Sequence, residues 1–204
     1  MLENNLVIQR AMNYVNQLLI PLENHYYHHY EHALDVMQRA VYLAKKEGLS
    51  DDDIEILALS ALFHDTWFII QYDKNEPIWA KIAQNYLKMM MYDRDKIDLI
   101  EQITLATDPD YKTPQNIYEK IIKDADLDNL GRHDFWDKTN DLNKEVEAIK
   151  QIKLKDPNWR HWVIEFLAEH KYYTQTQQYE RNHSKKENKH RLQKMVEELE
   201  KDEI

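Results

Sequence analysis

The chain of 204 residues is long enough for one domain with a buried core, and its hydrophobic fraction of 43% argues against disorder despite a charged fraction of 31%. A net charge of −10 argues against non-specific nucleic-acid binding through the overall electrostatic field, so no nucleic-acid partner is expected. Two glycines and no cysteine disfavour glycine-rich phosphate loops and exclude disulfides and thiolate zinc sites, so any metal must bind to His, Asp or Glu.

The N-terminal segment carries polar residues every few positions through its first 20 residues. This pattern predicts neither the apolar region of a signal peptide nor a membrane span. We therefore expect a soluble, cytoplasmic protein with no membrane partner.

Apolar residues recur at helical spacing along nearly the whole chain, and alternation of period two is nowhere sustained, which predicts an all-α fold. A first apolar stripe ends at Pro21, and a second helix is expected from about Tyr30 to Lys46, ending near Gly48. Ser50 is a good N-cap for a third helix, which runs into the pair His64-Asp65.

The second half of the chain continues the helical pattern. Pro77 fits the first turn of one helix and Asp93 caps the next. Another apolar stripe begins at Ile117, Asp156 starts a further helix, and Ser184 is expected to start the last one through a capping box.

No linker rich in Pro, Gly or Ser divides the chain. We expect a single-domain helical bundle with its core over residues 1–171. Residues 172–204 are expected to form a polar arm and an amphipathic C-terminal helix packed on the same domain. That last helix is a candidate contact surface for a homo-oligomer.

The first segment with residues suited to chemistry holds His25, His28, His29 and His32. His28 and His32 are four residues apart, so on a helix their imidazoles share one face and could hold a common ligand or metal. Taken alone, the segment is more typical of a surface cluster of His and Tyr.

The pair His64-Asp65 continues the buried stripe formed by Leu57 and Ala61, at i+7 and i+3 for His64. A carboxylate buried there would need a partner or a metal ion, because an isolated buried charge is costly. Taken alone, a His-Asp pair is more typical of a helix end where the stripe reaches the surface.

An acidic run from Asp124 to Asp128 follows the next stripe. Asp126 lies four residues beyond Ile122, so at least one carboxylate of the run should point inward. An acidic turn that closes the helix explains the pattern equally well. The nearby cations Lys123 and Arg132 could bind phosphate, although dispersed Lys and Arg are usually solvated.

Taken together, His32, then His64-Asp65, then Asp126 resemble the H…HD…D pattern of the HD-domain superfamily of metal-dependent phosphohydrolases. The resemblance covers roughly residues 24 to 135 and implies an all-α HD-domain bundle in which these four residues hold a divalent metal. Three segments carry it: YHHYEHALDV at Tyr27 to Val36 is similar to the family's YHN-x-x-HAxDV, LFHDTWF at Leu62 to Phe68 to its FHD, and KDADLDNLGR at Lys123 to Arg132 to its DADxLxxLG.

Two imidazoles and two carboxylates around one ion, with positions open for water, suit Mn²⁺, Fe²⁺, Mg²⁺, Ni²⁺ or Zn²⁺. The resemblance implies a catalytic role for the ligand Asp65, and His28 matches a position that acts as general acid in the distantly related cyclic nucleotide phosphodiesterases. Many relatives carry a further His that helps to hold a second metal, but Asn75 stands there, so one metal is expected rather than two.

The leading hypothesis is therefore a metal-dependent phosphohydrolase that acts on a small phosphoester or nucleotide through a metal-activated water. The alternative is a catalytically silent HD module that binds a metal or nucleotide for regulation, which Asn75 motivates. A third hypothesis is a purely structural helical bundle. Substrate specificity depends on pocket residues that the ligand pattern does not identify.

Overall fold

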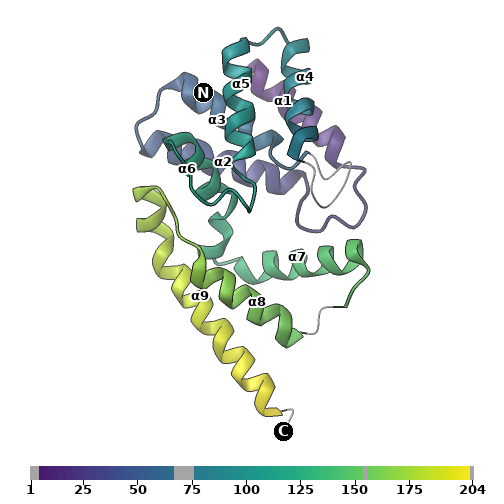
Figure 1. Ribbon diagram of the computed structural model, residues 1–204, viewed down its shortest axis with the longest axis vertical. Helices are drawn as coiled ribbons and strands as arrows, with labels where there is room; N and C mark the ends of the chain where they lie inside the picture. The colour runs from purple at the N-terminus through teal and green to yellow at the C-terminus, as the bar shows by residue number, and fades with distance from the viewer. Residues whose placement is uncertain (1–4, 67–75, 154–155, 203–204) are drawn as a thin grey trace.

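The computed structural model describes residues 5–66, 76–153 and 156–202, which contain helices and no strand (Figure 1). The predicted all-α class is confirmed. The helices are α1 (Leu6–Leu19), α2 (Tyr30–Lys46), α3 (Asp51–Phe63), α4 (Glu76–Met89), α5 (Arg94–Leu105), α6 (Ile117–Asp126), the 3₁₀ turn η3 (Asp128–Gly131), α7 (Phe135–Lys150), α8 (Asp156–Glu169) and α9 (Gln175–Asp202).

Helix starts agree with the sequence where a side chain caps the helix. Ser50 accepts a hydrogen bond from the backbone N–H of Asp53, whose side chain returns a bond to the Ser50 N–H, so the capping box precedes α3. Asp93 accepts from the backbone N–H of Lys96 at the start of α5. These side chains satisfy backbone donors that a helix N-terminus otherwise leaves free.

The expected start of the last helix at Ser184 is wrong, because α9 begins at Gln175. Thr174 accepts a hydrogen bond from the backbone N–H of Gln177 and is the residue that caps this helix. Ser184 lies inside α9, where its hydroxyl donates to the carbonyl of Gly131 at 2.6 Å. The polar stretch before Ser184 is therefore helical, and it packs through polar rather than apolar side chains.

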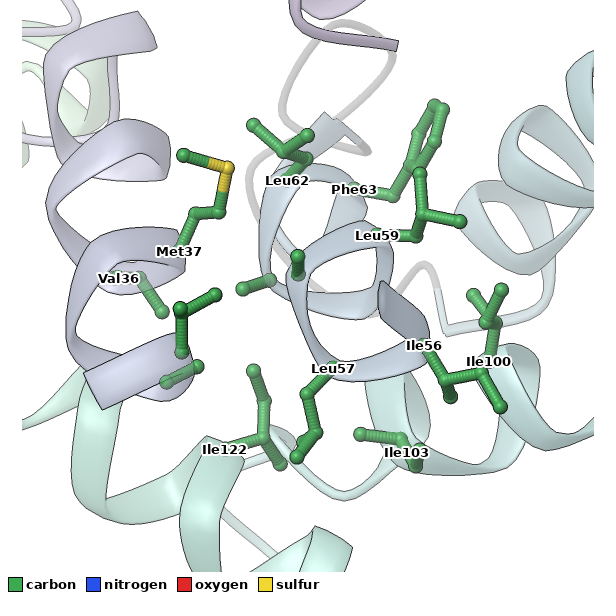
Figure 2. Close-up of a cluster of buried hydrophobic side chains, with 14 of the residues drawn as sticks. Val36, Met37, Ile56, Leu57, Leu59, Leu62, Phe63, Ile100, Ile103 and Ile122 are labelled. Atoms are coloured by element: carbon green, nitrogen blue, oxygen red, sulfur yellow. The ribbon is translucent and has the colours of Figure 1, made fainter. Parts of the chain in front are cut away.

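Helix α3 is the centre of the larger hydrophobic core (Figure 2). All its residues from Ile56 to Phe63 are buried, as expected for a helix that is apolar on every side. Figure 2 shows them flanked by Val36 and Met37 of α2, by side chains of α5, and by Ile122 of α6. The residues that directly follow α3 are thereby carried into the interior.

A second, smaller core joins η3, α7, α8 and α9 in the lower part of Figure 1. Its buried members are Leu130, Phe135, Trp159, Val163, Leu167, Tyr172 and Leu192. Polar contacts add to it: Asp128 accepts from Arg181 at 2.7 Å and from Gln177 at 2.9 Å. The predicted division of the chain at residues 171 and 172 stays a prediction.

Within the described part of the chain, no helix combines the length and apolarity needed to cross a bilayer.

Candidate metal centre

Three helix ends bring the predicted ligands together. His32 lies in the first turn of α2, His64 and Asp65 directly follow α3, and Asp126 is the last residue of α6. His32, His64 and Asp65 are buried, and Asp126 is half-buried. Residues that are distant in sequence thus converge because α2 and α6 both pack on the central helix α3.

The four side chains meet within hydrogen-bonding distance. Nε2 of His32 lies 3.2 Å from one carboxylate oxygen of Asp65 and 3.2 Å from one of Asp126. Nε2 of His64 lies 2.9 Å and 3.3 Å from the same two oxygens. The two imidazole rings are 5.2 Å apart between their centres. Two nitrogens and two oxygens therefore surround one point.

The protonation of His64 is fixed by its backbone. Its Nδ1 lies 2.7 Å from the carbonyl oxygen of Ala61, and a carbonyl only accepts, so Nδ1 carries the hydrogen. In a neutral ring Nε2 then presents a lone pair to the oxygens of Asp65 and Asp126. Acceptors facing acceptors are unfavourable unless a cation lies between them.

Hydrogen-bond geometry at the centre supports this interpretation. Within the described residues, Nε2 of His32, Nε2 of His64 and one oxygen of Asp65 have no hydrogen-bond partner, although all three atoms are buried. Buried polar atoms are rarely left unpaired in native proteins. The donor atoms of His32, His64 and Asp126 lie within 4.8 Å of one another, a separation that a divalent ion can span.

The four groups shift one another's protonation strongly. Burial opposes the charge on His64, but Asp65 and Asp126 outweigh it and raise the pKa of the imidazole well above its ordinary value. Burial likewise opposes ionisation of Asp65, yet His64 and His32 bring its pKa well below the ordinary value. A metal ion must therefore displace protons from the imidazoles when it binds.

His28 lies beside this centre, and its partner is a residue that the sequence did not identify. Glu145 of α7 accepts a hydrogen bond from Nδ1 of His28 and further bonds from the backbone N–H groups of Tyr27 and His28, at 2.8 and 2.9 Å. The His28 ring is edge-on to His32, with 5.8 Å between the ring centres. Glu145 is fully buried, and burial opposes its charge, but these hydrogen bonds lower its pKa.

The remaining histidines of the first segment have local contacts. His29 caps α2, accepting from the backbone N–H of His32 at 3.4 Å, and its ring contacts Glu31 at 2.9 Å. Nδ1 of His25 lies 3.0 Å from the carbonyl oxygen of Glu23. The structure therefore brings His32 and His28 to the centre, whereas the contacts of His25 and His29 are with neighbouring turns.

The acidic run after α6 divides into separate roles. Asp124 accepts hydrogen bonds from the backbone N–H groups of Tyr173 and Thr174, at 2.8 and 2.7 Å, and so attaches the start of α9. Asp128 forms ion pairs with Arg39 and Arg181. Of the three carboxylates, Asp126 is the one that faces the two imidazoles.

Two cations lie next to the centre. Arg132 and Lys138 line a small cavity together with His32 and Asp126. Arg132 is 2.5 Å from Asp134 and 3.1 Å from Asp35, so its charge is partly neutralised within the chain. Lys123 points elsewhere and donates to the backbone carbonyls of Ala106 and Asp108. Asn75, on which the one-metal expectation depends, lies outside the described residues.

Comparisons with known proteins agree with this geometry. The HD domain family model matches residues 29–128, a range that contains all four predicted ligands. The fold is similar to two crystal structures of Bacillus subtilis YpgQ, each 17% identical in sequence. The complex with ADP aligns with a TM-score of 0.64 over 96% of this chain and 94% of that chain. The selenomethionine form aligns with a TM-score of 0.63 over 96% and 93%. The search of curated proteins finds no match.

Proposed function

Because residues 29–128 form an HD domain, we propose that this chain is a phosphohydrolase that uses a divalent metal to hydrolyse a small phosphoester or a nucleotide. The observation that carries the proposal is the convergence of two imidazole nitrogens and two carboxylate oxygens 2.9–3.3 Å apart, with the buried nitrogens lacking hydrogen-bond partners within the described residues. An ion bound there would acidify a water molecule and polarise a phosphoryl oxygen.

His32, His64, Asp65 and Asp126 would hold that ion. His64 has its Nδ1 hydrogen bonded to a backbone carbonyl, an arrangement that fixes the ligating nitrogen of metal-bound histidines. Asp65 contributes a buried oxygen close to both imidazoles, so it also holds the two rings at the distance that an ion requires.

His28 is proposed to donate a proton to the leaving group. Its Nδ1 is fixed by Glu145, which leaves Nε2 as the ring atom for proton transfer. Arg132 and Lys138, which line the cavity beside Asp126, supply positive charge for an anionic substrate. The YpgQ structure that contains ADP supports a nucleotide as the first substrate class to test.

The experiment is a hydrolysis assay of the full chain on nucleoside mono-, di- and triphosphates and simple phosphoesters, with each of Mn²⁺, Mg²⁺, Ni²⁺ and Zn²⁺. Metal-stimulated release of phosphate, pyrophosphate or a nucleoside monophosphate is expected, with loss of activity in EDTA and in Asp65→Ala. Turnover that is unchanged by both EDTA and Asp65→Ala would contradict the proposal. Tight nucleotide binding without turnover of any substrate would instead favour the regulatory module.

A further inference from the structure

A second cavity lies between the C-terminal end of α8 and the middle of α9, and it shares no lining residue with the cavity beside the metal centre. Its volume is about 390 Å³, within the usual range for small-molecule sites. The lining residues that bear on its chemistry are His170, Lys171, Tyr172, Lys185, Lys186 and Lys189.

The charge of this cavity contrasts with that of the chain. The protein carries a net charge of −10, yet four lysines line the cavity, and no acidic residue is found in its described lining. Lysines on a surface of mixed charge are usually interspersed with carboxylates. Four ammonium groups around one hollow, without a carboxylate, form a local positive potential that a diffuse surface would not produce.

Lys185 is buried within this lysine cluster. Its ammonium group donates to the backbone carbonyl of His170 at 2.6 Å, lies 3.1 Å from Nδ1 of His170, and lies over the ring of Tyr172. These neutral partners hold it at the end of α8, where the helix dipole favours a cation. No carboxylate in the described part of the chain lies within ion-pair distance of Lys185.

The cap at α8 explains Lys185 but not the other three lysines. Burial and the positive charges of Lys189 and Lys186 lower the pKa of Lys185 to about 8, with only Asp124 opposing. The cations therefore repel one another, and their separate positions on two segments do not relieve the repulsion. A bound anion would neutralise all four groups at once.

We propose that this cavity is a second anion site, which binds a diphosphate group either as free pyrophosphate or as part of a nucleotide. Several ammonium groups suit the multiple charged oxygens of a diphosphate, since Lys binds phosphate as a point charge from any direction. The volume of about 390 Å³ exceeds what a single inorganic phosphate fills.

The site is connected to the metal centre through the segment between α8 and α9. The hydroxyl of Tyr172 donates to the carbonyl of Leu127 at 3.1 Å, next to Asp126. The backbone N–H groups of Tyr173 and Thr174 donate to Asp124. An anion held by Lys171 and Lys185 therefore stabilises the segment that is hydrogen-bonded to the ligand-bearing end of α6.

The test is thermal unfolding of the full chain in EDTA with increasing inorganic pyrophosphate, at an ionic strength kept constant with NaCl. Above the dissociation constant, each tenfold increase in pyrophosphate should raise Tm by about 3–6 °C. The double variant Lys186→Ala/Lys189→Ala should lose this shift, and its own Tm should equal or exceed that of the wild type, since repulsion around Lys185 is relieved.

Two further variants locate the site. Lys194→Ala changes an exposed lysine of the same helix that does not line the cavity, so it should keep the full shift. Asp126→Ala should also keep it, because the site needs no metal. Parallel titrations with ADP identify the source: a larger shift than with pyrophosphate indicates a nucleotide, and an equal or smaller one indicates free pyrophosphate. The proposal is overturned if the wild type shows no shift, or if Asp126→Ala abolishes the shift while the double variant retains it.

Discussion

Glu145 accepts a hydrogen bond from Nδ1 of His28 across 117 residues of sequence, and it also binds two backbone N–H groups of the segment that leads into α2. Helix α7 has only Phe135 and Glu145 fully buried, so this carboxylate is its main polar anchor to the segment before α2. The contact fixes His28 beside the metal centre and determines which of its ring nitrogens carries a hydrogen.

The substitution Glu145→Gln tests the role of this contact. If the amide oxygen keeps the two backbone bonds, its NH₂ group faces Nδ1 of His28, which must then accept, and the tautomer is reversed. We expect kcat to fall by about 100-fold or more, the size of a general acid–base contribution, with metal content and KM little changed. Steady-state kinetics and metal analysis measure these quantities.

The matched control is Asp141→Asn on the same helix, where the carboxylate pairs with the exposed Lys144 at 3.0 Å. It should leave kcat unchanged. A wild-type kcat in Glu145→Gln would show that the orientation of His28 does not matter for turnover.

His170 should make the chain less stable in acid. Burial, with the charges of Lys185 and Lys123, lowers its pKa from 6.5 to about 3, although Asp126 opposes this. Between these values the unfolded chain binds a proton that the folded chain does not, so stability from this group is complete above pH 6.5 and falls as the pH drops towards 3.

At pH 5 the loss due to His170 is about 2 kcal/mol. His170→Gln retains an acceptor for Lys185 but cannot titrate, so its free energy of unfolding should fall less between pH 7.5 and pH 5 than that of the wild type. Urea unfolding at the two pH values measures this difference. Equal losses in the two proteins would mean that His170 titrates normally in the folded chain.

Gly131 allows η3 to approach α9. A Cβ atom at this position would lie 2.8 Å from the Cβ and 2.8 Å from the carbonyl oxygen of Arg181, and the second of these is helix backbone that cannot rotate away. Gly131→Ala should therefore destabilise the fold by about 1–3 kcal/mol and increase hydrogen exchange around Ser184, whose hydroxyl donates to the Gly131 carbonyl.

Gly48→Ala is the comparison, since this glycine has a φ of +78° but open space on the side where a Cβ atom would lie. It should lose stability through backbone strain alone, without added exchange in α9. If both variants left exchange around Ser184 unchanged, the close approach of η3 and α9 would not be needed for α9 to dock.

Metal binding should depend on pH with a defined sign. The carboxylates raise the pKa of His64 well above its ordinary value, so the ion competes with a proton that is held more tightly than usual. Affinity should therefore keep increasing as the pH rises above 6.5, the ordinary value for imidazole. Calorimetry in buffers of different ionisation enthalpy should detect protons released on binding, and a pH-independent affinity with no proton release would contradict this interpretation.

Much of the fold and part of the site could be predicted from the sequence because both depend on local pattern. Ser50 and Asp93 cap helices through residues three positions away, and His64 continues a stripe that is buried on every side. Glu145 could not be found in this way. It is a single buried carboxylate on a helix with a mostly polar face, and its partner His28 is close only in the folded chain.

The start of α9 was wrong for a related physical reason. Its first half docks through Gln177 and Arg181, which bond to Asp128, and through Ser184 and Asn188, which bond to backbone carbonyls of η3. A helix that packs through hydrogen bonds has no apolar stripe, so periodicity did not reveal it.

The central claim is that His32, His64, Asp65 and Asp126 form one metal centre, and its most direct test is calorimetric titration of the metal-stripped full chain with Mn²⁺. The wild type and the control His183→Ala, whose ring is exposed, should bind Mn²⁺ with the same affinity. Asp126→Ala and His64→Ala should each weaken binding by more than the roughly 10–100-fold that loss of an outer partner causes. Unchanged Mn²⁺ affinity in both ligand variants would contradict the account.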